Sequence, residues 1–343
     1  MNKISVVVAA YNCESTIEAC LVSIEQQSFI ESLQVIVVLD APTDNSAQVV
    51  QRFCRDRKAF TVVALLKNVG VSMARNIGMQ HSQGEYIGFV DADDQCHPRM
   101  YQCLFEAACE GMADLAYCEM AAFSTQSPSE RNQAMSCEFL FQNTFVTNKI
   151  FKRELLIKHK IQFYKDQIFE DEPFVYTAWF SSQQTVAVNQ RLYFYRVGQQ
   201  SLCNDPNNQG LKARNNLHEK QLMLSRFMLD VQNRHQLKNQ ADKILECLCH
   251  HALAALYYRL PLSDLLSFYS FINYLIDKYG LRPYCTDSSS YYVSRFTKFQ
   301  ASPWLIVALK LRIAMVTHVQ SLRFGLKSFG SKVLLVKQVA YES

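Results

Sequence analysis

The chain has 343 residues, of which 49% are hydrophobic, so it is long and apolar enough for a catalytic domain and a further region. Its net charge of +4 comes from the segment Ser288–Tyr341, which holds eight Lys and Arg and neither Asp nor Glu, whereas the remainder is net acidic. The longest apolar run there, Trp304–Leu309, is far below the ~20 residues that span a bilayer, and twelve cysteines without a signal peptide indicate free thiols in a reducing compartment.

The N-terminal part alternates apolar strands with helices. Ile4–Ala10 is β-branched and apolar on both faces, as a buried parallel strand would be. Ile17, Leu21 and Ile24 then recur at helical spacing. The same pattern predicts strands at Val35–Leu39, Thr61–Leu66 and Tyr86–Val90, and helices at Ala47–Arg57 and within Asn68–Gly78. Repeated βα units predict a doubly wound α/β sheet that binds ligands at the carboxyl ends of its strands.

The pattern becomes less regular after Asp94. We predict a helix at Pro98–Glu110, a strand at Leu115–Glu119 and a polar surface loop at Ser124–Arg131. Partly helical structure is expected within Phe139–His159, and an aromatic-rich helix after an acidic cluster within Lys165–Phe180. A short strand at Leu192–Tyr195 and a mobile Asn-rich segment at Gln199–Gly210 follow. From Leu211 onward amphipathic helices dominate, with a break at Gly280–Ser290.

Three aspartates, Asp91, Asp93 and Asp94, follow the strand that ends at Val90. Because alternate residues of a strand point the same way, Asp91 and Asp93 are expected to face one cleft. Mg²⁺ or Mn²⁺ binds one or two such carboxylates together with phosphate oxygens. The sequence has neither the Gly-x-Gly-x-x-Gly nor the Walker pattern, so a dinucleotide enzyme or P-loop NTPase would lack its phosphate cradle. A solvated acidic turn is the alternative that these residues alone leave open.

Five segments, in this order and spacing, carry a resemblance to a known family. They are SVVVAAYN (Ser5–Asn12), VVLDAPTDNS (Val37–Ser46), NVGVSMARNIGMQHSQGEYIGFVDADD (Asn68–Asp94), FEDEPF (Phe169–Phe174) and LYFYRVGQQS (Leu192–Ser201). The series resembles the inverting GT-A-fold glycosyltransferases of family two, which use nucleotide-diphosphate sugars. The resemblance implies a Rossmann-like, doubly wound mixed sheet, followed here by a mainly α-helical C-terminal region.

The resemblance also implies roles for individual residues. Asp93 would be the main ligand of Mn²⁺ or Mg²⁺, with Asp91 as a second ligand or a contact to the sugar side. Asp171 would be the general base, and Glu170 would bind the acceptor or only favour the helix start. The nucleotide-sugar pocket would be lined by Ala9, Tyr11, Asp40, Asn68, Arg75, Asp91, Ala92 and Arg196, with Tyr11 along the base and Asp40 accepting from a uracil imide. Packing, turn or ion-pair roles remain alternatives for Tyr11, Asn68, Arg75 and Arg196, and we expect Glu172 to be structural.

Two departures from the family pattern affect these expectations. The usual Asp-Asp-Gly-Ser at the second strand reads Leu39, Asp40, Ala41, Pro42 here, which predicts a stiffer base-binding turn and less secure uridine specificity. Gln199 and Gln200 separate Gly198 from Ser201, which puts the lid contact of that segment in doubt.

We therefore predict a catalytic domain at 1–205, with a nucleotide-sugar half at 1–97 and an acceptor half at 98–205, and a helical, basic region at 206–343. The expected protein transfers a sugar from a UDP-hexose or UDP-N-acetylhexosamine to a glycan or lipid-linked acceptor in bacterial lipopolysaccharide or capsule synthesis. It would lie in the cytoplasm, peripheral at the inner face of the cell membrane, where the basic region meets anionic lipid. No nucleic-acid partner and no zinc site at Cys247–His251 are expected, and the oligomeric state is open. The alternatives are a non-catalytic scaffold of this fold and a metal-dependent phosphohydrolase.

Overall fold

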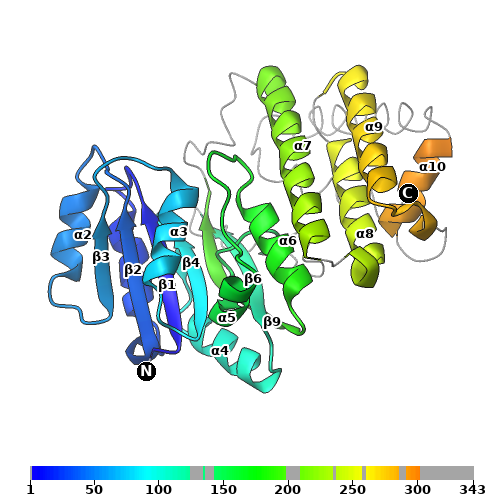
Figure 1. Ribbon diagram of the computed structural model, residues 1–343. Helices are drawn as coiled ribbons and strands as arrows, with labels where there is room; N and C mark the ends of the chain where they lie inside the picture. Colours follow the sequence, from blue (N-terminus) through cyan, green and yellow to red (C-terminus); the bar gives the residue numbers. More distant parts are fainter. Residues whose placement is uncertain are drawn as a thin grey trace, which may run out of the picture. The chain divides into compact units, whose positions relative to one another are not determined.

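The computed structural model describes residues 2–123, 134–135, 143–197, 209–234, 237–256, 260–285 and 291–301 (Figure 1). The chain forms two compact units, Met1–Asn207 with Glu219–Lys238, and Asn208–His218 with Asn239–Ser343. The expected loop Ser124–Arg131, most of the Asn-rich segment Gln199–Gly210 and the end of the chain from residue 302 lie outside the described residues.

The first half of the sheet is parallel and follows the strand order β3-β2-β1-β4. Its elements, in chain order, are β1 (Ile4–Ala10), α1 (Ile17–Glu25), η1 (Ile30–Ser32), β2 (Leu33–Leu39), α2 (Ser46–Cys54), β3 (Phe60–Ala64), α3 (Val71–His81) and β4 (Tyr86–Asp91). Every strand and helix predicted before Asp94 is present, with ends that differ by a few residues. The alternating βα pattern is confirmed in this half.

The second half of the sheet is mixed and continues as β8-β6-β9-β5, with β7 paired to β6. Strand β8 is antiparallel to both β4 and β6, whereas β9 is parallel to β6 and antiparallel to β5. The elements are β5 (Gln95–Cys96), α4 (Met100–Glu110), β6 (Leu115–Phe123), β7 (Ala134–Met135), β8 (Lys149–Lys152), α5 (Arg153–Lys158), α6 (Asp171–Ser181) and β9 (Thr185–Arg196). The predicted α/β fold with a doubly wound mixed sheet is confirmed.

Two strands in this half differ from the prediction. The partly helical structure expected within Phe139–His159 is present as α5, but residues 149–152 before it form β8, which was not predicted, because KIFK fills the sheet between β4 and β6. Strand β9 has 12 residues, far more than the expected Leu192–Tyr195, because its polar first part TVAVNQR pairs along β6 through a bulge near Glu119. Tertiary pairing overrides local pattern in both places.

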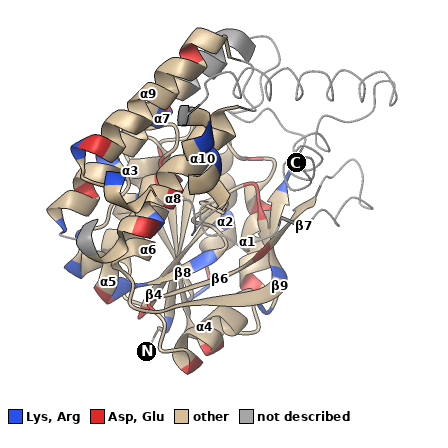
Figure 2. Cartoon of the chain, turned by 90° about the vertical axis from the view of Figure 1, so that its right-hand side faces the viewer, with Lys and Arg blue, Asp and Glu red and all other residues tan. Residues whose placement is uncertain are grey.

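Helices cover both faces of the sheet because consecutive strand residues point to opposite sides. Val6 and Val8 of β1 pack with Leu21 of α1 in one buried cluster, and Val7 packs with Ala74 of α3 in another. In Figure 2, α3, α5 and α6 lie on one side of the strands. The strands therefore read as continuous apolar runs, which is why they were predictable.

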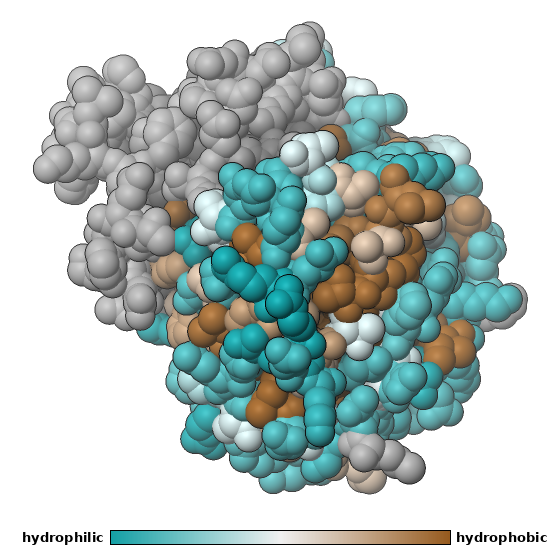
Figure 3. Space-filling model, turned by 90° about the vertical axis from the view of Figure 1, so that its left-hand side faces the viewer, coloured by the Kyte–Doolittle hydropathy of each residue, from teal (hydrophilic) through white to brown (hydrophobic). Residues whose placement is uncertain are grey.

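The edge of the sheet at β3 has a half-exposed surface. Val62 and Val63 are only partly buried, and Leu66, just beyond the strand, is fully exposed. Figure 3 views the molecule from this side and shows hydrophobic side chains gathered among hydrophilic ones.

The described part of the C-terminal region, residues 209–234, 237–256, 260–285 and 291–301, is mainly helical, as predicted. Its elements are α7 (Gln209–Asn233), α8 (Leu237–Ala255), α9 (Leu262–Lys278), η4 (Arg282–Tyr284) and α10 (Tyr291–Ala301). No helix in the described ranges is both long and apolar enough to cross a membrane. The ten cysteines within those ranges have free thiols, as expected.

Candidate active site

The site lies at the carboxyl ends of β1 and β4, which are neighbours in the sheet. The chain leaves β1 toward β2 and β3 on one side, and returns as β4 on the other side of β1. Such a point, where the strand order reverses, leaves a crevice at the strand ends. Ala9 of β1 pairs with Asp91 of β4 at this point. Ala9, a predicted pocket residue, is therefore next to Asp91, one of the two predicted metal ligands.

The loops that follow β1 and β2 are joined by side-chain hydrogen bonds. The Thr43 amide donates to Oδ1 of Asn12 over 2.8 Å, and the Asn45 amide donates to Glu14 over 2.9 Å. Asn12 has a left-handed φ of 46°, which asparagine tolerates better than most residues. Beside this junction Tyr11 is 46% exposed, so its ring has an open surface on which a base could stack.

Asp40 is buried at the end of β2 and organises the loop that leads into α3. Its carboxylate accepts the amides of Val69 over 2.7 Å and Gly70 over 2.9 Å, and Asn68 donates to its carbonyl oxygen. The next residue, Ala41, has a φ of 48° where the family pattern has glycine. The described contacts of Asp40 are thus structural, and its contact with a nucleobase stays a prediction.

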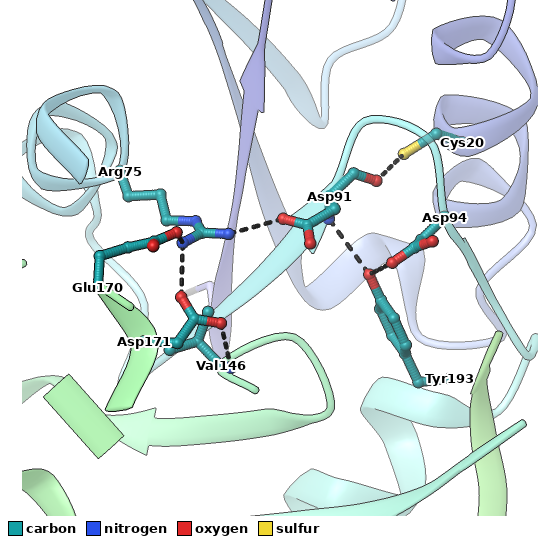
Figure 4. Close-up of polar contacts among 8 residues, drawn as sticks. All are labelled: Cys20, Arg75, Asp91, Asp94, Val146, Glu170, Asp171 and Tyr193. Carbon is teal, nitrogen blue, oxygen red and sulfur yellow. Dashed lines mark hydrogen bonds and ion pairs between the residues drawn. The ribbon is translucent and has the colours of Figure 1, made fainter. Parts of the chain in front are cut away.

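Arg75 of α3 joins the two halves of the site (Figure 4). Its guanidinium is almost fully buried and lies 2.7 Å from Asp91, 2.7 Å from Asp171 and 3.0 Å from Glu170. Charged and planar, a guanidinium can bridge several carboxylates at once. The predicted metal side and the predicted base side therefore meet at one residue, while a direct contact of Arg75 with nucleotide remains a prediction.

A glycine on the same helix sets the position of Arg75. A Cβ on Gly78 would lie 2.3 Å from a methyl carbon of Val7, so only glycine lets α3 approach β1 this closely. Arg75, one turn earlier on α3, is thereby held near the sheet at the level of Asp91.

Burial controls the protonation of this cluster. It raises the pKa of Glu170 to about 7, helped by the charge of Asp171, and it raises the pKa of Asp171 against the lowering effect of Arg75. Burial would lower the pKa of Arg75, but Asp171, Asp91 and Glu170 outweigh it, so the guanidinium stays charged. The site thus holds a fixed cation beside carboxyl groups poised to bind a proton.

Asp94, the third aspartate of the acidic cluster, is buried and makes its contacts within the protein. It is 1% exposed, and its carboxylate accepts the Tyr193 hydroxyl over 2.6 Å and the Arg196 amide over 2.7 Å (Figure 4). Burial raises the pKa of Asp94 to about 8, with a further contribution from the charge of Asp91. Asp94 therefore joins the turn after β4 to β9.

Arg196 adds a second bond between these elements. Its Nε donates to the carbonyl oxygen of Asp93 over 2.6 Å, and its guanidinium lies 4.8 Å from the ring of Phe123. The Arg196 side chain is buried against the turn that follows β4, so it does not form the surface ion pair that was the alternative. Its reach to a diphosphate remains a prediction.

Asp91 and Asp93 fit a divalent cation by their chemistry. Burial and the neighbouring charge of Asp91 raise the pKa of Asp93, so a cation between these carboxylates would relieve their repulsion. Within the described ranges no group of three or more His, Cys, Asp and Glu could hold a metal alone. Two carboxylates with substrate phosphates complete the coordination that Mg²⁺ commonly has. Ala92, between them, is half-buried in the same turn.

Lys149 and Val146 belong to the site but were not predicted. The Val146 amide donates to Oδ2 of Asp171 over 3.2 Å, and the fully buried Lys149 donates to the Phe145 carbonyl over 2.7 Å and to Asn143 over 3.2 Å. Lys149 therefore fixes the loop that positions the Val146 amide, and its charge lowers the pKa of Asp171. The available signal was Lys149 itself, a lysine directly before the apolar pair Ile150 and Phe151.

The mixed sheet, the acidic turn at the switch point and the following helices define the GT-A fold. Residues 5–173 match the family model described as Glycosyl transferase family 2. Together with the similar proteins below, this match supports a glycosyltransferase of that fold.

Two similar proteins come from Escherichia coli and Bacillus subtilis. The chain is 27% identical over 265 residues to the Escherichia coli K12 protein described as uncharacterized glycosyltransferase YibD, covering 71% of this chain and 74% of YibD. It is 29% identical over 226 residues to uncharacterized glycosyltransferase EpsJ of Bacillus subtilis 168, covering 59% of this chain and 63% of EpsJ, which is less than two thirds.

Solved structures share the fold. Residues 1–349 of TarS from S. aureus in complex with UDP align with a TM-score of 0.59 at 20% identity, covering 82% of this chain and 89% of that one. The mannosyltransferase PcManGT from Pyrobaculum calidifontis, in complex with GDP-Man and Mn²⁺, aligns with a TM-score of 0.51 at 16% identity, covering 88% and 80%.

Proposed function

We propose that this protein transfers a hexose or N-acetylhexosamine from a nucleotide-diphosphate donor, most simply a UDP-sugar, to a hydroxyl of a glycan acceptor with inversion. The observation that carries this proposal is the arrangement of carboxylates around Arg75. Asp91 at the end of β4 and Asp171 at the start of α6 each lie 2.7 Å from the same guanidinium, although they are far apart in sequence. A donor held at the first carboxylate would place its anomeric carbon toward the second.

The transfer would be one displacement. Asp171 accepts the proton of the acceptor hydroxyl while the oxygen forms a bond to the anomeric carbon. The bond from that carbon to the phosphate oxygen breaks, and its electron pair leaves with the nucleoside diphosphate. Attack opposite the leaving group inverts the configuration. The raised pKa of Asp171 suits a base, and Arg75 and the Val146 amide orient its carboxylate.

Asp91 and Asp93 are the residues that would hold Mn²⁺ or Mg²⁺, which when bound would stabilise charge on the leaving diphosphate. Arg75 holds Asp91 through Oδ1, and Asp94 holds the turn through Tyr193. Tyr11, Asn68 and the loops around Asp40 would contain the nucleoside. Glu170 would bind the acceptor, a role compatible with its place on Arg75 beside Asp171.

The support for a UDP donor comes from similar proteins. Two of the similar TarS structures are complexes, one with UDP and one with UDP-GlcNAc, whereas the PcManGT structure is a complex with GDP-Man and Mn²⁺. Since the same fold accepts both bases, and since Ala41 replaces the usual glycine, a panel of donors is needed. Incubation with UDP-, GDP- and dTDP-sugars and Mn²⁺, followed by slow release of nucleoside diphosphate, tests the proposal. One or a few UDP-sugars should be hydrolysed.

Two outcomes would contradict this function. Absence of nucleotide-sugar binding with Mn²⁺ would favour a non-catalytic scaffold of the same fold. Release of free phosphate from a phosphomonoester, without sugar transfer, would favour a phosphohydrolase.

We place the reaction in bacterial surface-polysaccharide synthesis, such as lipopolysaccharide or capsule, at the cytoplasmic face of the membrane. The support is a relative, TarS, described as a poly(ribitol-phosphate) β-N-acetylglucosaminyltransferase, and the basic segment from Ser288, whose greater part lies outside the described residues. Deletion of residues 303–343 should release the protein from anionic vesicles, because each Lys or Arg at such a surface contributes ~1 kcal/mol. Undiminished sedimentation with vesicles would remove the membrane role of the segment.

A further inference from the structure

The loop between α5 and α6, residues 159–170, is held by the later part of helix α7. The Tyr164 hydroxyl donates to Asp230 over 2.6 Å, and Arg226 donates to Gln167 over 2.6 Å. One residue into α6, Glu172 forms an ion pair with Lys220. The three α7 residues belong to the segment Glu219–Lys238, which is part of the same compact unit as the loop. This loop ends at Glu170 and Asp171, the predicted acceptor-binding and base residues.

Apolar packing accompanies these polar contacts. Met223, Leu224, Phe227 and Val231 recur at three- and four-residue spacing on α7 and are all buried. The ring of Phe227 lies 5.3 Å from Tyr176 and 5.5 Å from Phe180, both on α6. On its other side α6 packs against the sheet through Phe174 and Val175. Helix α6 is therefore enclosed from both sides, and this explains why it is apolar around its whole circumference.

Lys220 makes the contact nearest to the predicted base. Lys220 is buried and Glu172 is mostly buried, at 7% and 14% side-chain exposure, so loss of either charge would weaken the compensation of the other. The Lys220 ammonium also lies 4.0 Å from the ring centroid of Phe169. It thus contacts residues on both sides of the pair Glu170–Asp171.

We propose that Lys220 is a positioning residue for the transfer reaction. It holds Phe169 and Glu172, and so fixes the backbone between them at the angle that points Asp171 toward the acceptor hydroxyl. The inference rests on the proposed function and deepens it, because it assigns part of the catalytic geometry to a helix beyond the residues 5–173 that match the family model.

The test is steady-state sugar transfer by the full chain with the donor identified in the panel. In Lys220→Met we expect kcat to fall about 10- to 100-fold, since small misplacements of a reacting group have effects of this size. The affinity for nucleoside diphosphate with Mn²⁺ should change less than about twofold, because the donor side of the site is untouched. Lys158→Met, at an exposed position on α5, removes the same charge and should leave kcat unchanged.

Two further variants separate positioning from general stability. Lys220→Arg keeps the charge and should retain kcat within about threefold. The pair Lys220→Met with Glu172→Gln should recover part of the lost kcat, because the carboxylate that faced the ammonium is then neutral as well. If Lys220→Met does not fold, Arg226→Met tests the same loop and should lower kcat with unchanged donor affinity.

Normal kcat in a folded Lys220→Met or Arg226→Met protein would overturn the inference, as would an equal loss of donor affinity. These results differ from failure of the proposed function. If Asp171→Asn is inactive while Lys220→Met is normal, only the role of Lys220 is lost. If Asp171→Asn remains fully active, Asp171 is not the base, and the proposed function itself is contradicted at that point.

Discussion

The two halves of the sheet hold their parts of the site in different ways. In the parallel half, hydrogen bonds between neighbouring loops 29 to 31 residues apart in the chain, such as Asn12 with Thr43 and Asp40 with Val69 and Gly70, shape the proposed donor side. In the mixed half, the predicted base depends on Arg75, 96 residues earlier in the chain, and on a loop held by α7. The proposed donor side is thus held by hydrogen bonds between loops, and the proposed acceptor side by buried ion pairs between residues far apart in the chain. Substitutions should therefore affect the two sides differently.

The largest effect is expected at Asp171, in the mixed half. Asp171→Asn keeps the shape of the side chain but cannot accept the acceptor proton, so kcat should fall ~10³-fold, within the usual range for general base catalysis. Nucleotide affinity, measured by calorimetry with Mn²⁺, should stay within about twofold of wild type. Near-normal turnover would remove Asp171 as the base.

The next effect concerns Arg75, the link between the halves. Arg75→Met leaves Asp91, Glu170 and Asp171 without their shared cation, so the free energy of unfolding at pH 7 should fall by about 3–5 kcal/mol. Urea denaturation measures this change. Arg52→Met, which removes an exposed guanidinium paired with Glu18, is the matched control and should change stability little. Similar values for the two variants would show that Arg75 does not link the halves energetically.

On the donor side, Asp93→Ala should weaken Mn²⁺-dependent binding of UDP by roughly tenfold or more, since a metal ligand is lost. The stability of the protein should change little, in contrast to Arg75→Met. Asp166→Ala, at an 80% exposed carboxylate, serves as the control. Equal UDP affinity of wild type and Asp93→Ala, both with and without EDTA, would exclude chelation by Asp93.

As pH rises, the contribution of the mixed half to stability should fall, whereas kcat should rise. Glu170 has its pKa raised to about 7 in the folded chain, against ~4.3 when unfolded, so the folded state binds its proton more tightly. Its stabilising contribution is complete below pH ~4.3 and is lost as pH rises through about 7, whereas kcat should rise with pH as Asp171 loses its proton. Melting temperatures across this range should decline less in Glu170→Gln than in wild type, while the exposed Glu31→Gln should match wild type. An identical decline in both variants would contradict the raised pKa.

The smallest effect is expected in the turn after β2. Ala41→Gly should stabilise the protein by about 0.5 kcal/mol, because relief of a left-handed alanine slightly exceeds the entropy cost of glycine. Ala64→Gly, in strand β3, makes the same change where φ is extended and should destabilise instead. Thermal melts of both variants give the comparison. A loss of stability in Ala41→Gly would mean that its φ is not strained.

The sequence predicted every strand and helix of the parallel half, with ends within a few residues, because buried βα units combine apolar runs with helical spacing. It also predicted that Asp91 and Asp93 follow a central strand. The convergence of Asp91, Glu170 and Asp171 on Arg75 could not be predicted from local pattern, since it depends on the packing of α3 against the start of α6. Strand β8 and the first part of β9 were missed for the same reason: short or polar segments become strands only when their neighbours are in place.

The hydrogen bonds between Asp94 and β9 set an order for folding during protein synthesis. Tyr193 and Arg196, the partners of the Asp94 carboxylate, are made 99 and 102 residues later, and β5 has its partner strand in β9. While the chain emerges from the ribosome, β1 to β4 can assemble early, since domains fold from the N-terminus as they are synthesised. The turn with Asp91 and Asp93 must wait in an unfinished state until residue 196 has been translated. A nascent chain stalled before that point would contain Asp91 and Asp93, the proposed metal ligands, and still lack the partners of Asp94 that complete the turn.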